Sequence, residues 1–89
     1  KCYRALHAPV VIKWPGSGVV LTMEADEIFK HVILYSPKDN HEFFAVEPVT
    51  NCNNGFNMAE KGMDDTGTIY MRPGDAVTGR ITIRLSEME

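Results

Sequence analysis

The last part of the chain alternates between two kinds of residue, and this pattern restricts the fold more than any other feature. One set is Val77, Gly79, Ile81, Ile83 and Leu85, and the polar set between them is Thr78, Arg80, Thr82, Arg84 and Ser86. A period of two is typical of a β-strand with one buried and one solvated face. The pattern therefore predicts a long strand from Val77 to Leu85, which opens at the turn residues Pro73-Gly74-Asp75.

Five other segments are typical of strands because they are rich in β-branched and aromatic residues. They run from Pro9 to Trp14, Gly18 to Ala25, Phe29 to Tyr35, Phe43 to Val49 and Thr68 to Met71. The turn residues Pro15-Gly16-Ser17-Gly18 are expected to join the first two as a hairpin. Residues 25–29 and 58–61 could hold a helical turn but are too short for a stable helix. We predict an all-β fold, an antiparallel sheet or partial β-sandwich of about six strands.

The 89 residues form a single domain, 1–89, whose core is small for its surface. The predicted strand 18–25 is apolar on both faces, with Leu21 and Met23 on one side and Val20 on the other. Such a strand needs cover on both faces. We expect that cover from the rest of a longer chain, since no initiator Met precedes Lys1, or from other copies in a homo-oligomer, a dimer or larger.

Charge and hydropathy exclude several classes of partner. The net charge is −3 and no basic cluster occurs, so neither nucleic acid nor a membrane surface is expected as a partner. No apolar run approaches the roughly 20 residues of a membrane helix, and no signal peptide is recognisable. The two cysteines, Cys2 and Cys52, fit no metal motif and are expected to be plain thiols in the cytoplasm, with a single disulfide as the alternative.

Glu47 is the residue that stands out chemically. It interrupts the apolar run Phe43 to Val46 and is followed at once by Pro48, which suggests a bend or a sheet edge. A carboxylate among large apolar groups loses hydration and binds a proton more readily, which suits a general base. From the residues alone, a Glu on the solvent face of an edge strand is the simpler interpretation, since carboxylates with perturbed hydration are a minority.

The remaining polar and aromatic candidates are weaker. His7, His31 and His41 are isolated and form no ligand set, so structural or exposed positions are expected for them. Trp14 and Tyr35 could stack on a sugar, although aromatic residues more often fill a core. The acidic groups Asp64-Asp65 and 24–27 lack the spacing of a calcium loop.

Several motifs resemble the carboxy-terminal part of the aldose 1-epimerase (galactose mutarotase-like) family. The run Phe43-Phe44-Ala45-Val46-Glu47-Pro48-Val49-Thr50 and the loop ending in Phe56-Asn57 resemble its Glu-Pro signature. Val32-Ile33-Leu34-Tyr35-Ser36-Pro37 resembles its Val-Tyr-Thr-Pro strand, and Met71-Arg72-Pro73-Gly74-Asp75 resembles its Leu-x-Pro-Gly-Glu turn. Trp14-Pro15 before a Gly-rich turn also fits. The matches follow the family's order and cover nearly the whole chain.

The resemblance implies a large antiparallel β-sandwich that interconverts the α and β anomers of free sugars without a metal or organic cofactor. In that mechanism a Glu takes the proton of the anomeric hydroxyl and a His protonates the ring oxygen. The resemblance assigns the base to Glu47 and places Tyr35 and Asn57 at the sugar.

The family's substrate-binding Asp and its two catalytic His residues have no match in this sequence. We therefore expect a mutarotase-like segment that is inactive alone, since a lone base contributes about 10²–10⁴-fold. The alternatives are a stand-alone oligomeric β protein with a sugar or other small ligand between its copies, and a plain protein-interaction domain.

Overall fold

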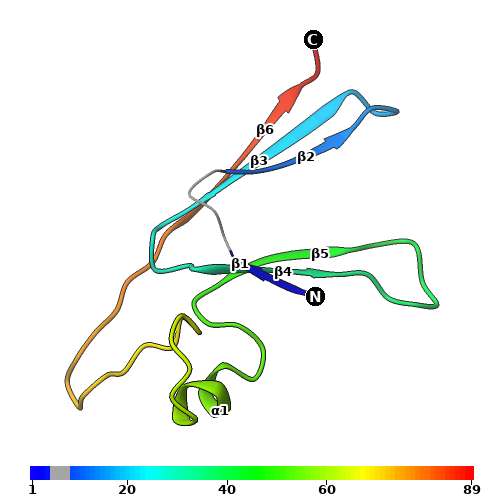
Figure 1. Ribbon diagram of the computed structural model, residues 1–89. Helices are drawn as coiled ribbons and strands as arrows, with labels where there is room; N and C mark the ends of the chain where they lie inside the picture. The colour runs from blue at the N-terminus through cyan, green and yellow to red at the C-terminus, as the bar shows by residue number, and fades with distance from the viewer. Residues whose placement is uncertain (5–8) are drawn as a thin grey trace.

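The computed structural model describes residues 1–4 and 9–89, which form two three-stranded antiparallel sheets and one short helix (Figure 1). The elements are β1 (Cys2–Arg4), β2 (Val10–Trp14), β3 (Val19–Ala25), β4 (His31–Tyr35), β5 (Ala45–Val49), α1 (Gly55–Glu60) and β6 (Ile81–Glu87). The predicted all-β, partially sandwiched fold is confirmed.

One sheet has the order β2-β3-β6, and one of its two faces is apolar across all three strands. Val10 pairs with Met23, which pairs with Ile83, and Ile12 pairs with Leu21, which pairs with Leu85. Because paired residues point to the same side, this face is apolar across all three strands. The other face is mixed. It carries Lys13, Thr22, Thr82 and an ion pair between Glu24 and Arg84, together with Val11 and Val20. The period-two pattern of the last segment therefore predicts the apolar face of β6 correctly, and Val20 lies on the second side of β3, as the sequence predicts.

The second sheet has the order β1-β4-β5. Cys2 lies opposite Ile33, which lies opposite Glu47, so these three residues form one row across the sheet. Val32 and Leu34 point to the other face together with their partners on β5, Pro48 and Val46. β1 was not expected from the sequence, because three residues are too few to show a periodic pattern.

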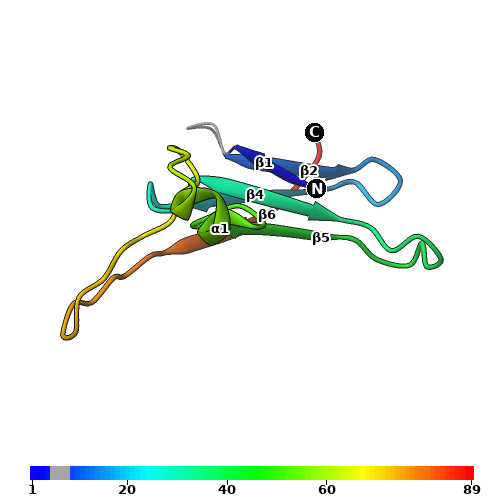
Figure 2. The ribbon, with the colours of Figure 1, turned by 60° about the horizontal axis from the view of Figure 1, so that its bottom comes forward.

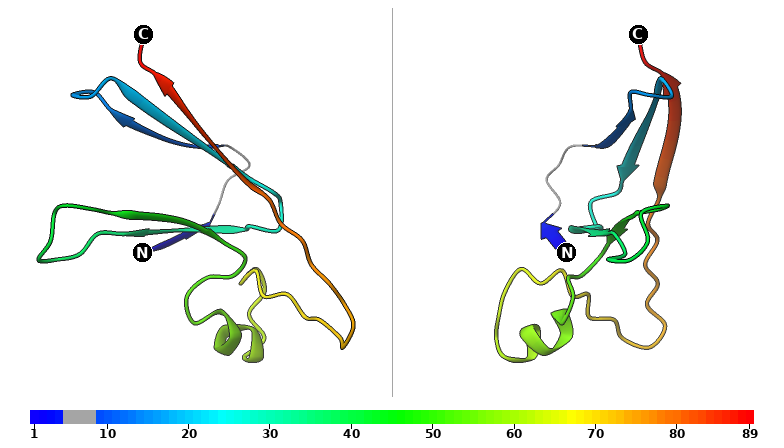
Figure 3. Two further views of the ribbon diagram at one scale, coloured as in Figure 1. Left: turned by 180° about the vertical axis from the view of Figure 1, so that it is seen from behind. Right: turned by 90° about the vertical axis from the view of Figure 1, so that its right-hand side faces the viewer.

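The two sheets lie face to face as an open wedge, closest at the turn between β3 and β4 (Figures 1 and 3). Across the open side, the ring of Trp14 stacks on that of Phe44, with centroids 6.3 Å apart. Trp14 belongs to the apolar face of its sheet, so that face is turned inward. Val46 is two residues after Phe44, so the two side chains lie on the same face of the second sheet. That face is therefore also turned inward.

The segment between β5 and β6 departs from the sequence prediction. Thr68 to Met71 was expected to be a strand and is not one, and β6 begins at Ile81 rather than at Val77. This segment loops away from both sheets, so it finds no partner strand to complete a ladder (Figure 1). The turn at Pro73-Gly74 is confirmed, with the amide of Asp75 donating to the Arg72 carbonyl at 3.0 Å.

The interior of the wedge is small. Among the described residues, Met23, with 9% of its surface exposed, is the one apolar side chain that is buried. Leu34, Phe44, Ile83 and Leu85 all carry apolar side chains and are all exposed. A chain of this length buries only a modest part of its surface, which agrees with the expected small core.

Candidate functional site

Glu47 and Tyr35 lie on the same face of the β1-β4-β5 sheet, the one turned away from the other sheet. Glu47 on β5 is opposite Ile33 on β4, and Tyr35 is two residues further along β4, opposite Ala45. Such diagonal neighbours have side chains about 7–8 Å apart, within reach of an aromatic ring and a long side chain. The sheet register therefore places side by side two of the three residues that the sequence singles out for a sugar site.

Both side chains of this pair are open to solvent. Glu47 was expected to be poor in hydration because it follows an apolar run, but the residues of that run do not enclose it. Phe43 precedes β5, and Phe44 and Val46 point toward the inside of the wedge. On its own face, Glu47 is flanked by Ala45 and Val49 along β5 and by Ile33 across the ladder. The arrangement is a carboxylate and an aromatic ring displayed together on an accessible surface.

The other end of this face is covered by the loop segments around α1 (Figure 2). His31 is 6% exposed, and its Nδ1 lies 3.5 Å from the carbonyl oxygen of Thr50. Arg4, opposite His31 on β1, forms an ion pair with Asp65 of the loop. The loop therefore covers the end of this face that carries His31 and leaves the end that carries Glu47 and Tyr35 uncovered.

Asn57 lies on α1 rather than on a strand. Its side-chain amide donates to the Asn54 side-chain oxygen at 2.7 Å, and Asn54 has a positive φ of 61° at the start of the helix. The helix forms where the sequence predicted only a helical turn, and Asn57 helps to shape its first turn. Asn57 is exposed, but its amide is engaged within the helix rather than with Glu47 or Tyr35.

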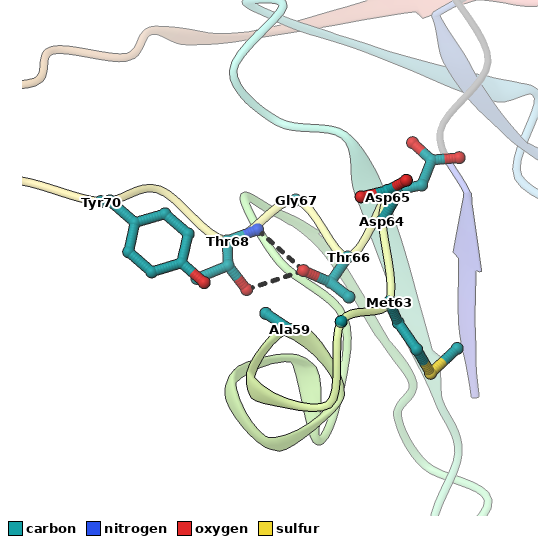
Figure 4. Close-up of a pocket in the computed structure, with 9 residues that line it drawn as sticks. Ala59, Met63, Asp64, Asp65, Thr66, Gly67, Thr68 and Tyr70 are labelled. Carbon is teal, nitrogen blue, oxygen red and sulfur yellow. Dashed lines mark hydrogen bonds between the residues drawn. The ribbon is translucent and has the colours of Figure 1, made fainter.

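A pocket of about 250 Å³ opens beside α1, lined by residues other than those that the sequence assigns to a sugar site (Figure 4). Its wall consists mainly of the loop after the helix: Ala59, Gly62, Met63, Asp64, Asp65, Thr66, Gly67, Thr68 and Tyr70. The hydroxyl oxygens of Thr66 and Thr68 lie 2.8 Å apart and satisfy each other. Thr66 is buried, so this hydrogen bond organises the loop rather than presenting a free group to a ligand.

The remaining candidates occupy structural or peripheral places. Trp14 takes part in the contact between the sheets, which is the core role expected for it, and His41 is exposed in the loop between β4 and β5. His7 lies outside the described residues. Cys2 and Cys52 are free thiols. In residues 1–4 and 9–89, no group of three or more His, Cys, Asp or Glu side chains is placed to hold a metal ion.

No protein-family model, curated protein or solved structure matches this chain. In the described part of the chain, no helix has the length and apolar character needed to cross a membrane.

Proposed function

We propose that the β4-β5 face forms one wall of a sugar-binding site in a β-sandwich of the aldose 1-epimerase type. The observation that carries the proposal is the shared, solvent-open face of Glu47 and Tyr35. An aromatic ring stacks on the C–H face of a sugar, and a carboxylate accepts hydrogen bonds from its hydroxyls. The motif order in the sequence supports the same function, with Glu47 as the base that takes the anomeric proton.

The chain by itself supplies a base without a partner acid. His31 shares the face with Glu47, but it is buried beneath the loop and its Nδ1 faces the Thr50 carbonyl. Opening of a sugar ring needs proton donation to the ring oxygen as well as removal of the anomeric proton. We therefore propose sugar binding without appreciable mutarotation by this chain alone, in a reducing compartment such as the cytoplasm that keeps Cys2 and Cys52 as thiols.

The test is a titration of the isotopically labelled chain with galactose or glucose, followed by NMR. The amide signals of residues 33–35 and 45–47 are expected to shift in a saturable manner at millimolar sugar. Tyr35→Ala should abolish the shifts because it removes the stacking surface. Tyr70→Ala is the matched control, since Tyr70 is another exposed tyrosine but lies in the loop after α1.

Polarimetry on the same samples measures the chemical step. The rate of glucose or galactose mutarotation should stay at the buffer value, with or without Glu47→Gln. Glu47 is exposed, so Glu47→Gln should change the free energy of unfolding by less than about 0.5 kcal/mol. Sugar-induced shifts elsewhere in the chain, or none at all, would contradict the proposed site, and a fast rate that Glu47→Gln abolishes would contradict the proposed lack of turnover.

A further inference from the structure

The open edge of β6 is the most exposed strand surface in the described part of the chain. β6 pairs with β3 on one side, and on its other side no strand from residues 1–4 or 9–89 is hydrogen-bonded to it. Figure 3 shows it at the outer margin of its sheet. An unpaired edge of this kind is a template for pairing with another chain.

The hydrogen bonds at the two ends of β6 reveal which backbone groups face this open edge. The amide of Asp26 donates to the Arg80 carbonyl at 3.0 Å, and the amide of Met88 donates to the Gly18 carbonyl at 2.8 Å. Both contacts continue the β3-β6 register. In an antiparallel ladder, alternate residues point their polar groups to opposite sides. Even-numbered residues of β6 therefore face β3, and Ile81, Ile83, Leu85 and Glu87 present their N–H and C=O groups to the open edge.

The residues whose backbone groups face the open edge also carry most of the exposed apolar side-chain surface of the strand. The side chains of Ile81, Ile83 and Leu85 point to the inner face of the wedge, and all three are exposed. Unpaired backbone groups and apolar side chains thus coincide on the same three residues. A strand added at this edge would form hydrogen bonds with the unpaired backbone groups and would cover part of the apolar side chains.

The other sheet edges are less suited to pairing. β5 contains Pro48, which has no N–H to donate, and β1 has only three residues. β2 has five residues and carries Lys13 on its exposed edge, whereas β6 has seven residues and contains no proline or lysine. Short strands, proline and lysine are among the features by which proteins protect their edges, and β6 has none of these three. Its charged residues are Arg84, which is paired with Glu24, and Glu87 at its end.

The sequence of β6 is complementary to itself in one antiparallel register. With Ile83 on a two-fold axis, Ile81 lies opposite Leu85 of the second copy and Thr82 lies opposite Arg84. Apolar residues then meet apolar residues, and the outward-facing groups of Ile81, Ile83 and Leu85 pair as the ladder requires. A shift of the axis to Arg84 would oppose two arginines, and a shift to Leu85 would place Glu87 against Ile83.

We propose that two copies of this chain join through their β6 strands, antiparallel and centred on Ile83, into a continuous sheet of order β2-β3-β6-β6-β3-β2. Each Arg84 already has its counter-ion, Glu24 of the same chain, so the contact brings no unpaired like charges together. Closed two-fold dimers are the commonest assembly for such a self-complementary surface. The proposal does not depend on the sugar site, which lies on the other sheet.

The first test is the mass of the chain in solution, measured by light scattering after size-exclusion chromatography. At micromolar concentration the mass should be twice the 10.0 kDa of the chain. Ile83→Lys and Ile83→Glu should each give a monomer, because like charges would face each other across the axis. An equimolar mixture of the two variants should restore the dimer, since opposite charges would then meet.

Val11→Lys is the matched control and should remain a dimer. Val11 is exposed to a similar extent, 51% against 57% for Ile83, but it lies on the opposite edge strand, β2. Circular dichroism should show unchanged strand content in all three variants. A wild-type monomer, a dimeric Ile83→Lys, or a mixture that stays monomeric would each overturn the proposal.

Amide hydrogen exchange gives a second readout that tests the register itself. In the wild-type dimer the amides of Ile81, Ile83 and Leu85 should be protected along with those of Thr82 and Arg84. In Ile83→Lys the protection of Ile81 and Leu85 should be lost, while that of Thr82 and Arg84, which face β3, should remain. Protection of Ile81 and Leu85 that persists in the monomeric variant would overturn the proposed pairing.

Discussion

At the scale of single residues, Gly67 is the position with the least freedom to change. Its φ is +79°, a conformation that residues with a Cβ rarely adopt. A Cβ at this position would lie 2.0 Å from the Thr50 carbonyl oxygen and 3.0 Å from Nδ1 of His31. Gly67 therefore allows the loop to pack over His31 without covering Glu47.

We expect Gly67→Ala to destabilise the fold by well over 1 kcal/mol, because the backbone strain, on the order of 1 kcal/mol, is joined by a collision with backbone atoms. Gly74→Ala is the control, since Gly74 has a φ of +89° but nothing within 4 Å of the added Cβ. Urea unfolding of both variants measures the difference. Equal losses of stability would mean that the loop does not pack on Thr50 as described.

At the scale of elements, the start of β6 depends on the turn after β3. The amide of Arg80 donates to Oδ2 of Asp26 at 2.9 Å, and the Arg80 carbonyl accepts from the Asp26 amide at 3.0 Å. Gly79, the preceding residue, leaves no room for a Cβ, which would lie 2.5 Å from Ile28. The turn thus extends the β3-β6 ladder by one pair of residues and positions the entry to β6.

Asp26→Ala should cost about 0.5–1.5 kcal/mol of stability, because it removes one hydrogen bond to a backbone amide. Asp26→Asn should retain most of the stability, since its side-chain oxygen can still accept from the Arg80 amide. Hydrogen exchange at Arg80 is the local readout, and it should accelerate in the alanine variant only. If both variants behave as the wild type, this turn does not hold the start of β6.

At the scale of the whole molecule, the wedge is closed on its open side by the contact of Trp14 with Phe44. Few other apolar groups between the sheets are well covered. The relative position of the two sheets therefore depends on this pair to an unusual degree. The same openness leaves the side chains of Ile81, Ile83 and Leu85 exposed, and these are the residues whose backbone groups pair in the proposed dimer.

Phe44→Ala should shift the fluorescence of Trp14 to longer wavelength, because water replaces the ring that stacks on the indole. Trp14 is the only tryptophan in the sequence, so its emission reports this contact alone. Phe43→Ala is a matched control, since Phe43 is the adjacent residue and is 52% exposed, compared with 49% for Phe44. A shift of equal size in both variants would argue against the contact between the sheets.

The sequence predicts the bounds of strands β2 to β5 to within two residues, and it predicts which residues of β6 lie on its apolar face and which on its polar face. Both follow from alternation, which is a local property that any strand carries in its own residues. It also indicated Glu47 and Tyr35 individually. Their position on one face follows from the register of β4 with β5, which is set between segments distant in the sequence.

Which strand-like segments form strands, and which polar residues are buried, follows from contacts between distant parts of the chain. Thr68 to Met71 has strand-forming residues but no partner, whereas Cys2–Arg4 has little pattern and pairs with β4. Glu47 is exposed, although the apolar run before it in the sequence suggested a poorly hydrated position. His31, by contrast, is buried. The physical reason is that ladder pairing and burial depend on what another part of the chain places alongside, and the loop from Asn51 to Gly67 covers His31 but stops short of Glu47.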